Sequence, residues 1–254
     1  MISSVELAPE IEQELSDFVA TAQGAFGADL ICAVLFGSAA EARLRSVSDV
    51  NLLLLLKRYR QQSVDQIRDA FRAAHAAIRL DVMFLLESEI EPAMDAFAVK
   101  FSDILVRRRV LFGPDPFASL TIPPVLLRQR IIQTLLNLML RMRERYALVS
   151  LREEQLALVA AEAAAPLRVC AASILSLEGR AAKPPREALA AMLAEPGCPR
   201  EDRLSELIDM ARRKEPLPPG TAGPLVFALI GVAGFMYQRV TGPVDRGGRQ
   251  VDHD

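Results

Sequence analysis

Small and polar residues follow or interrupt apolar runs at three places in the first half of the chain. Gly37 and Ser38 follow the first apolar run. Ten residues further on, Asp49 and Asn51 stand two apart at the start of the run VNLLLLL. Asp81 lies inside a later run, RLDVMFLL. Backbone amides next to glycine bind phosphates, and carboxylate and amide oxygens bind hard cations, so these residues can bind anions or metal ions if the fold brings them together.

The Gly37-Ser38 pair is suited to phosphate binding. Glycine lets the backbone approach a phosphate closely, because a side chain there would hold the ligand away. Ser38 adds a hydroxyl and a backbone N–H. The residues that follow, AAEARL, favour a helix, and the free amides at a helix N-terminus bind anions. An ordinary turn is the alternative, since Gly-Ser after a strand is common.

Asp49 and Asn51 begin a predicted strand, so their side chains face the same side of a sheet. Asp81 lies in another predicted strand. Asp49 and Asp81 each interrupt an apolar strand, where a carboxylate costs free energy unless it is paired, hydrogen-bonded or bound to metal. Neighbouring strands could bring Asp81 to Asp49, on one face and within reach of a shared metal ion. The alternatives are that Asp49 caps a turn and that Asp81 is a surface residue of an edge strand.

Apolar periodicity predicts the elements that position these residues. We expect a helix at 9–25, buried strands at 31–35 and 50–56, a helix at 60–78 and a strand at 79–86. The run 50–56 is apolar on both faces, as in a central strand covered on both sides. After breakers at 112–117 and 122–124 the strand signals end, and helices are expected near 125–149, 151–178 with Pro166 as a kink or break, 186–194, 202–213 and 224–239.

These patterns predict an α+β protein. Residues 1–120 would form a mixed sheet with flanking helices, and residues 121–242 an all-α helical domain. The polar residues 243–254 are expected to be a disordered tail. Lys and Arg number 12 against 17 Asp and Glu in the first of these segments, and 16 against 12 in the second, so an acidic half precedes a basic half.

Composition limits the function classes. The net charge of −2 provides no general attraction to nucleic acid or to an anionic membrane. The longest late apolar run has 13 residues, short of the roughly 20 that span a bilayer, and predicts a buried bundle helix. Cys32, Cys170 and Cys198 are widely spaced, and the N-terminus lacks the basic start and apolar centre of a signal peptide. We therefore expect reduced thiols in a cytoplasmic protein, without a zinc site or a membrane span.

Gly37-Ser38, ten intervening residues, Asp49-x-Asn51 and the later Asp81 together resemble the signature of the polymerase-beta-type nucleotidyltransferase superfamily. That signature is Gly-Ser or Gly-Gly, about ten residues, Asp-x-Asp or Asp-x-Glu, and a third acid. The close resemblance covers residues 31–86. Chain length and a helical second half are similar to the layout of streptomycin/spectinomycin adenylyltransferases, a likeness of architecture and not of motifs.

The resemblance implies a role for each residue. Gly37 and Ser38 would bind the β- and γ-phosphates of a nucleoside triphosphate, with ATP expected. Asp49 and Asp81 would be the catalytic carboxylates, and Asp49, Asn51 and Asp81 the ligands of Mg²⁺ or Mn²⁺. Asp81, as the third acid, would bind the metal or accept the proton of the acceptor hydroxyl.

Asn51 departs from the signature, because it replaces the middle carboxylate. In two-metal phosphoryl transfer the metal ions neutralise the triphosphate and polarise the attacking and leaving oxygens. An asparagine amide is neutral and offers one good oxygen to a hard cation. We therefore expect a weakened two-metal site, a single-metal site, or nucleotide binding without turnover.

Residues 107–152 hold nine arginines and only two acidic residues, Asp115 and Glu144; the arginines are Arg107, Arg108, Arg109, Arg128, Arg130, Arg141, Arg143, Arg145 and Arg152. They could pair with the acidic first half, form a solvated face, or line a cleft for the triphosphate or an anionic acceptor. Such a cleft suits a polycationic aminoglycoside poorly, so a neutral or anionic acceptor is expected.

The two histidines give no catalytic pattern. A related architecture that pairs this core with an RNA-cleaving helical domain needs an Arg-x4-6-His motif, and His75 and His253 stand in the wrong places for it. His75 is expected to be structural.

Two function classes remain. The first is an enzyme that transfers a nucleoside monophosphate from a nucleoside triphosphate to a hydroxyl of a small molecule or a protein. The second is a catalytically impaired homologue that binds nucleotide or a protein partner and acts as a regulator. Fold alone does not separate them.

Overall fold

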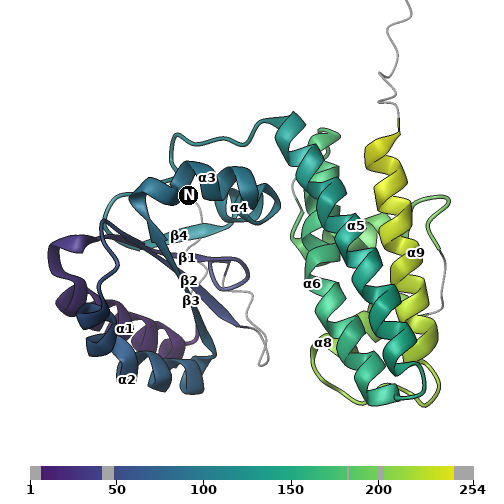
Figure 1. Cartoon of the computed structure of the whole chain (residues 1–254), viewed down its shortest axis with the longest axis horizontal. Helices are drawn as coiled ribbons and strands as arrows, with labels where there is room; N and C mark the ends of the chain where they lie inside the picture. The colour runs from purple at the N-terminus through teal and green to yellow at the C-terminus, as the bar shows by residue number, and fades with distance from the viewer. Residues whose placement is uncertain (1–6, 42–48, 182, 200–202, 243–254) are drawn as a thin grey trace, which may run out of the picture. The chain divides into compact units, whose positions relative to one another are not determined.

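The computed structural model describes residues 7–41, 49–181, 183–199 and 203–242. The chain divides into two compact units, residues 1–127 and residues 128–254. The first unit contains the sheet, and the second is helical (Figure 1). The tail expected at 243–254 lies outside the described residues.

A mixed sheet organises the first unit. The strands have the order β3-β2-β1-β4, with β2 parallel to β3 and β1 antiparallel to both of its neighbours. The elements of the unit are, in chain order, α1 (Pro9–Phe26), η1 (Gly27–Asp29), β1 (Leu30–Phe36), β2 (Val50–Leu56), α2 (Gln61–Ile78), β3 (Leu80–Leu86), η2 (Glu87–Glu89), α3 (Ile90–Ala96), α4 (Ala98–Val106) and β4 (Arg108–Phe112). Together with the helical second unit, this arrangement confirms the predicted α+β class.

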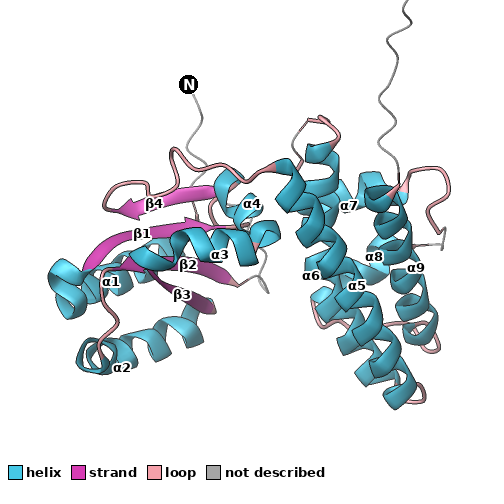
Figure 2. Ribbon diagram, turned by 45° about the horizontal axis from the view of Figure 1, so that its top comes forward, coloured by secondary structure: helices cyan, strands magenta, loops and turns pink. Residues whose placement is uncertain are grey.

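Both faces of the sheet are covered by helices. Side chains alternate between the two faces along β2. Leu52 and Leu54 pack in the core shared with α1 and α2, whereas Leu53 and Leu55 pack in the core shared with α3 and α4. Figure 2 shows α1 and α2 on one side of the sheet and α3 and α4 on the other. The predicted central strand, covered on both sides, is confirmed.

The prediction left out α3, α4 and β4. Residues of β4 are all half-buried, and two of its five are arginines, so the strand shows neither the apolar run nor the strict alternation from which strands are predicted. The expectation that strand signals end at the breakers from residue 112 onward holds, because β4 ends at Phe112 and the described residues beyond it form no strand. Gly113 follows β4 with a φ of 76°, and a Cβ atom there would lie 2.2 Å from the backbone oxygen of Ile31. Only glycine fits this close approach.

Long helices form the second unit, as predicted. They are α5 (Pro124–Val149), α6 (Glu153–Leu177), α7 (Pro185–Leu193), α8 (Leu204–Arg212) and α9 (Ala222–Thr241). The central helix is α6, which packs against α7, α8 and α9. It continues through Pro166 without a break. Contacts with its neighbours account for this continuity, because tertiary packing supplies most of the stability of a helix.

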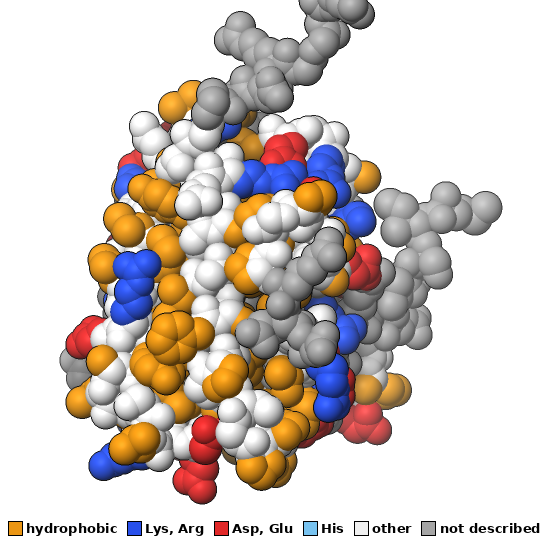
Figure 3. All heavy atoms as spheres, turned by 90° about the vertical axis from the view of Figure 1, so that its right-hand side faces the viewer, with side chains coloured by type: hydrophobic (Ala, Val, Ile, Leu, Met, Phe, Trp, Pro, Cys, Tyr) orange, Lys and Arg blue, Asp and Glu red, His pale blue; other side chains and the backbone are white. Residues whose placement is uncertain are grey.

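Two helices of this unit, α6 and α9, are long and apolar enough to cross a membrane by length and composition. About half of the most apolar stretch of each is buried, and the two helices pack against each other. Leu148, Leu151 and Phe227 are exposed apolar residues of the unit. Figure 3 shows one side of the molecule, where hydrophobic side chains are spread across the surface and charged side chains lie mainly toward its edges.

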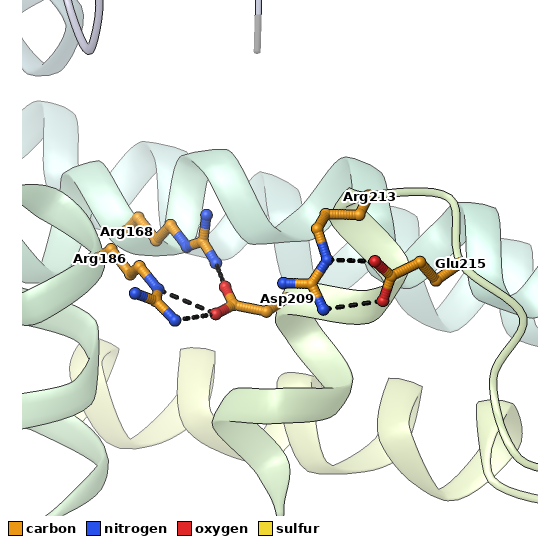
Figure 4. Close-up of polar contacts among 5 residues, drawn as sticks. All are labelled: Arg168, Arg186, Asp209, Arg213 and Glu215. Atoms are coloured by element: carbon orange, nitrogen blue, oxygen red, sulfur yellow. Dashed lines mark hydrogen bonds and ion pairs between the residues drawn. The ribbon is translucent and has the colours of Figure 1, made fainter. Parts of the chain in front are cut away.

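A buried carboxylate connects three helices of the second unit. Asp209 of α8 is 3% exposed and pairs with Arg168 of α6 and Arg186 of α7 (Figure 4). The Nε atom of Arg186 donates to Asp209 Oδ2 at 2.9 Å. Since a buried charge is costly without partners, this cluster fixes the position of α8 relative to α6 and α7.

Candidate functional site

Strand pairing brings three of the predicted positions to one end of the sheet. Asn51 of β2 is the Cα partner of Phe36 in antiparallel β1 and of Asp81 in parallel β3. Paired residues on neighbouring strands lie side by side and point to the same face. Phe36 packs in the core shared with α3 and α4, so Asn51 and Asp81 belong to that face as well. The next residue after Phe36 is Gly37.

The Gly37 turn leaves open space beside Asn51. Gly37 has a φ of 76°, which favours glycine, and a Cβ atom there would lie 3.8 Å from Nδ2 of Asn51. Its backbone N–H donates to the carbonyl of Arg107 at 3.0 Å, and its carbonyl accepts from the amide of Ala40 at 3.2 Å. The loop backbone is thereby held against the segment between α4 and β4, while the side facing Asn51 stays free of a side chain.

The helix expected directly after Ser38 does not begin there. Residues 37–41 form turns, and residues 42–48 lie outside the part of the chain that the structure describes. Ser38 is half-buried, and Ala39 is buried in the core on the α1 and α2 side. Of the two alternatives for Gly37-Ser38, the structure shows the turn at residues 37–41. The predicted helix N-terminus that would bind phosphate is absent from these residues.

Asp49 lies just before β2 and not inside an apolar strand. Its side chain is 52% exposed, and Oδ1 accepts from Nε of Arg79 at 2.9 Å. Its backbone carbonyl accepts from Nδ2 of Asn51 at 3.3 Å. This hydrogen bond uses the amide nitrogen of Asn51. Its Oδ1 atom remains as an acceptor of hydrogen bonds or a ligand of a cation. The expected burial cost at Asp49 is corrected, since the carboxylate is exposed and has a cationic partner.

Asp81 lies near the start of β3, an edge strand, and is exposed. The alternative that Asp81 is a surface residue of an edge strand is therefore correct. The argument that a buried carboxylate needs a partner was wrong for Asp81, as it was for Asp49. Its place in the register is what connects it to the site, because its Cα partner is Asn51. Asp81 and Asn51 thus belong together even though neither is deeply buried.

Lys100 is a residue of this region that sequence reasoning missed. It lies in α4, and its Nζ atom is 5.6 Å from the centroid of the Phe36 ring. Desolvation lowers the pKa of Lys100, and the charge of Asp81 acts in the opposite direction. A single lysine on an amphipathic helix gives no specific signal in the sequence, so only the fold connects it with Asp81.

The predicted arginines of the first unit are used in ion pairs. Arg107 pairs with Asp103 and Glu41, Arg108 with Asp115, and Arg109 with Glu12. Pairing with the acidic first half was one of the alternatives, and it holds for these three. In the second unit Arg128 donates to the carbonyl of Val240 at 3.0 Å, whereas Arg141, Arg143 and Arg145 are exposed on α5.

His75 has a structural role in α2. Its Nδ1 atom lies 2.8 Å from the carbonyl oxygen of Leu80, to which it donates. Its ring also meets the edge of Phe71, with the centroids 6.4 Å apart. The histidine therefore fixes the end of α2 to the start of β3, next to Asp81.

Few anionic donor atoms are available at this end of the sheet. Within the described ranges no cluster of three or more His, Cys, Asp or Glu side chains could hold a metal ion. Asp49, Asn51 and Asp81 supply two carboxylates and one amide oxygen, of the kind that Mg²⁺ accepts beside water and phosphate oxygens. A second divalent ion would need further anionic ligands, which Asn51 does not supply.

A scan against protein families finds no match, and neither does a search of curated protein sequences. A comparison with solved structures finds a spectinomycin adenyltransferase from Enterococcus faecialis, determined with ATP and spectinomycin, at a TM-score of 0.59 and 14% identity. The match covers 90% of this chain and 98% of that chain. This likeness shows the fold: a four-stranded mixed sheet with flanking helices, followed by a helical C-terminal region, as in that adenyltransferase. At this level of identity it establishes neither substrate nor activity.

Proposed function

We propose that this chain binds a nucleoside triphosphate, with ATP expected, at one end of the sheet. This end holds the last residues of β1 and the first residues of β2 and β3. The observation that supports the proposal is the strand register, which pairs Phe36 with Asn51 and Asn51 with Asp81; Gly37 directly follows Phe36. The open space at Gly37 lets phosphate oxygens approach the backbone of the loop. Ser38 follows with a hydroxyl and an N–H as further donors.

We further propose that the bound nucleotide is a substrate. A hydroxyl oxygen of the acceptor attacks the α-phosphorus, the bond to the β-phosphate oxygen breaks, and pyrophosphate leaves. Asp81, whose carboxylate is exposed at the edge, accepts the proton of the attacking hydroxyl. Asp49, Asn51 and Asp81 would hold one Mg²⁺ or Mn²⁺, which neutralises phosphate charge when bound.

The acceptor is proposed to be neutral or anionic, in a small molecule or a protein. The excess of arginine over acidic residues in 107–152 supports this preference, because a basic surface disfavours a polycation. Spectinomycin, which is bound in the structurally similar enzyme, is a direct test of this preference. We expect the reaction to take place in the cytoplasm.

A second candidate function has an observation of its own in favour. Asn51 is neutral, and Arg79 already occupies the Asp49 carboxylate. A site in which Asp81 is, of the described carboxylates, the one without an arginine partner at Asp49's distance is weak in negative charge, which favours binding over turnover; the chain would then act as a nucleotide-binding regulator.

Two measurements separate the candidates. Purified protein is incubated with each α-labelled nucleoside triphosphate, Mg²⁺ or Mn²⁺ and cell lysate, and labelled product is sought; spectinomycin is added as a separate arm. Calorimetric titration measures binding of the same nucleotides. Labelled product that Asp81→Asn abolishes supports the transferase. Binding without product supports the regulator, and failure of all four nucleotides to bind at millimolar concentration rejects both.

A further inference from the structure

Lys100 is held over the end of β1 from which the Gly37 turn begins. Its ammonium lies 5.6 Å from the ring centroid of Phe36, a distance at which a cation is attracted to the face of an aromatic ring. Phe36 is the Cα partner of Asn51, and Asn51 is the Cα partner of Asp81. The lysine therefore lies above the row of residues to which the nucleotide is assigned.

Charges at this edge of the sheet balance before any ligand arrives. Asp49 pairs with Arg79 at 2.9 Å, and the charge of Asp81 acts on Lys100. These two carboxylates and two cations sum to zero. A divalent ion is attracted by surplus negative charge, and Asn51 adds none. Among the described residues, nothing at this edge would attract a second divalent ion once the first is bound.

We propose that Lys100 binds the triphosphate and supplies the positive charge that a second divalent ion would supply at a site with three carboxylates. The proposal rests on the nucleotide binding proposed above and names the side chain that determines its strength. A lysine ammonium is a compact charge with three rotatable donors on a flexible stem, well suited to phosphate oxygens. A triphosphate that approaches the backbone at Gly37 meets it above Phe36.

The first test is calorimetric titration of ATP into four proteins, with Mg²⁺ and again with chelator. Charge-assisted hydrogen bonds of this kind are strong, so Lys100→Met weakens ATP binding about 10- to 100-fold. Lys100→Arg keeps the charge and stays within a few-fold of the wild type. Lys57→Met is the matched control: Lys57 is exposed just beyond the opposite end of β2, and its loss leaves ATP binding unchanged.

The second test counts bound ions. Manganese titration followed by electron paramagnetic resonance gives one Mn²⁺ per ATP complex in the wild type. In the double variant Lys100→Met with Asn51→Asp the sum of these charges changes from zero to −2, and two ions bind. Circular dichroism checks that Lys100→Met remains folded.

Two results overturn the role of Lys100 while the proposed function stands. One is ATP binding by Lys100→Met as tight as that of the wild type, and the other is two Mn²⁺ ions in the wild-type complex. A wild type that binds no triphosphate overturns nucleotide binding itself, and the role of Lys100 with it.

Discussion

Asn51→Asp places a third carboxylate between two that are already present, without a change in volume. Neighbouring strands are about 4.8 Å apart, and two unit charges about 5 Å apart repel by about 0.8 kcal/mol in water and about 3 kcal/mol at an effective dielectric constant of 20. Asp49 and Asp81 are both exposed, so the lower value applies to each. Lys100 offsets part of the sum. We expect the variant to lose about 1 kcal/mol of stability in the absence of metal.

Divalent metal should reverse this loss. The new carboxylate adds a charged ligand to the single-cation site, so the variant binds Mg²⁺ or Mn²⁺ more tightly than the wild type does. Metal present at about 100 times its dissociation constant stabilises the folded state by about 2.7 kcal/mol. The variant therefore starts below the wild type in chelator and approaches or passes it in excess metal.

Thermal melts in chelator and in excess metal measure both effects. For a unit of this size a change of 1 kcal/mol moves the melting temperature by about 4 °C. Asn137→Asp is the control, since Asn137 is an exposed asparagine on α5 and the same substitution there adds the same charge. Identical metal responses of wild type, Asn51→Asp and Asn137→Asp would show that Asn51 does not belong to a cation site.

Four further variants or conditions test other parts of the structure. Gly37→Ala should cost about 1–2 kcal/mol because of its left-handed backbone, and should weaken ATP binding in calorimetry because the methyl group enters the open space of the site. Arg79→Gln should cost at most about 1 kcal/mol, since the pair it breaks is exposed, and should raise Mn²⁺ affinity by releasing a carboxylate. Asp209→Ala should destabilise the helical unit by about 3 kcal/mol in urea denaturation, because it removes the common partner of two arginines. Hydrogen bonding from Arg108 lowers the pKa of Asp115, so the stability from this pair is complete above the ordinary pKa and is lost as the pH falls through the lowered value; Asp115→Asn should be destabilising at pH 7 and neutral in strong acid.

The sequence was sufficient to predict the strands β1, β2 and β3 and the long helices, because their apolar periodicity is strong. It was insufficient for α3, α4 and β4. The strand β4 lies at an edge and consists of half-buried residues, two of them arginines. Arg108 pairs with Asp115, seven residues away, and Arg109 pairs with Glu12, 97 residues away. Such a strand is defined by its partner β1 and by long-range pairs, which local patterns do not contain.

Much the same holds for the candidate site. The spacing of Gly37, Asn51 and Asp81 was visible in the sequence, but the register that pairs Asn51 with Asp81 is seen only in the structure. Arg79 and Lys100 were not predictable as its partners. Exposure also reversed one argument: Asp81 was expected to need compensation inside a strand, but an edge strand leaves its carboxylate in water.

Arg79 ends α2 in a left-handed conformation, with a φ of 54°, and makes two bonds of different kinds. Its guanidinium binds the carboxylate of Asp49, and its carbonyl accepts from the amide of Val50 at 3.2 Å. A cation that binds the carboxylate of Asp49 breaks its bond to the Arg79 guanidinium. The hydrogen bond between the Val50 amide and the Arg79 carbonyl remains. The amide of Val50 is therefore a natural reporter: its rate of deuterium exchange should change when the site is filled, without any label or substitution.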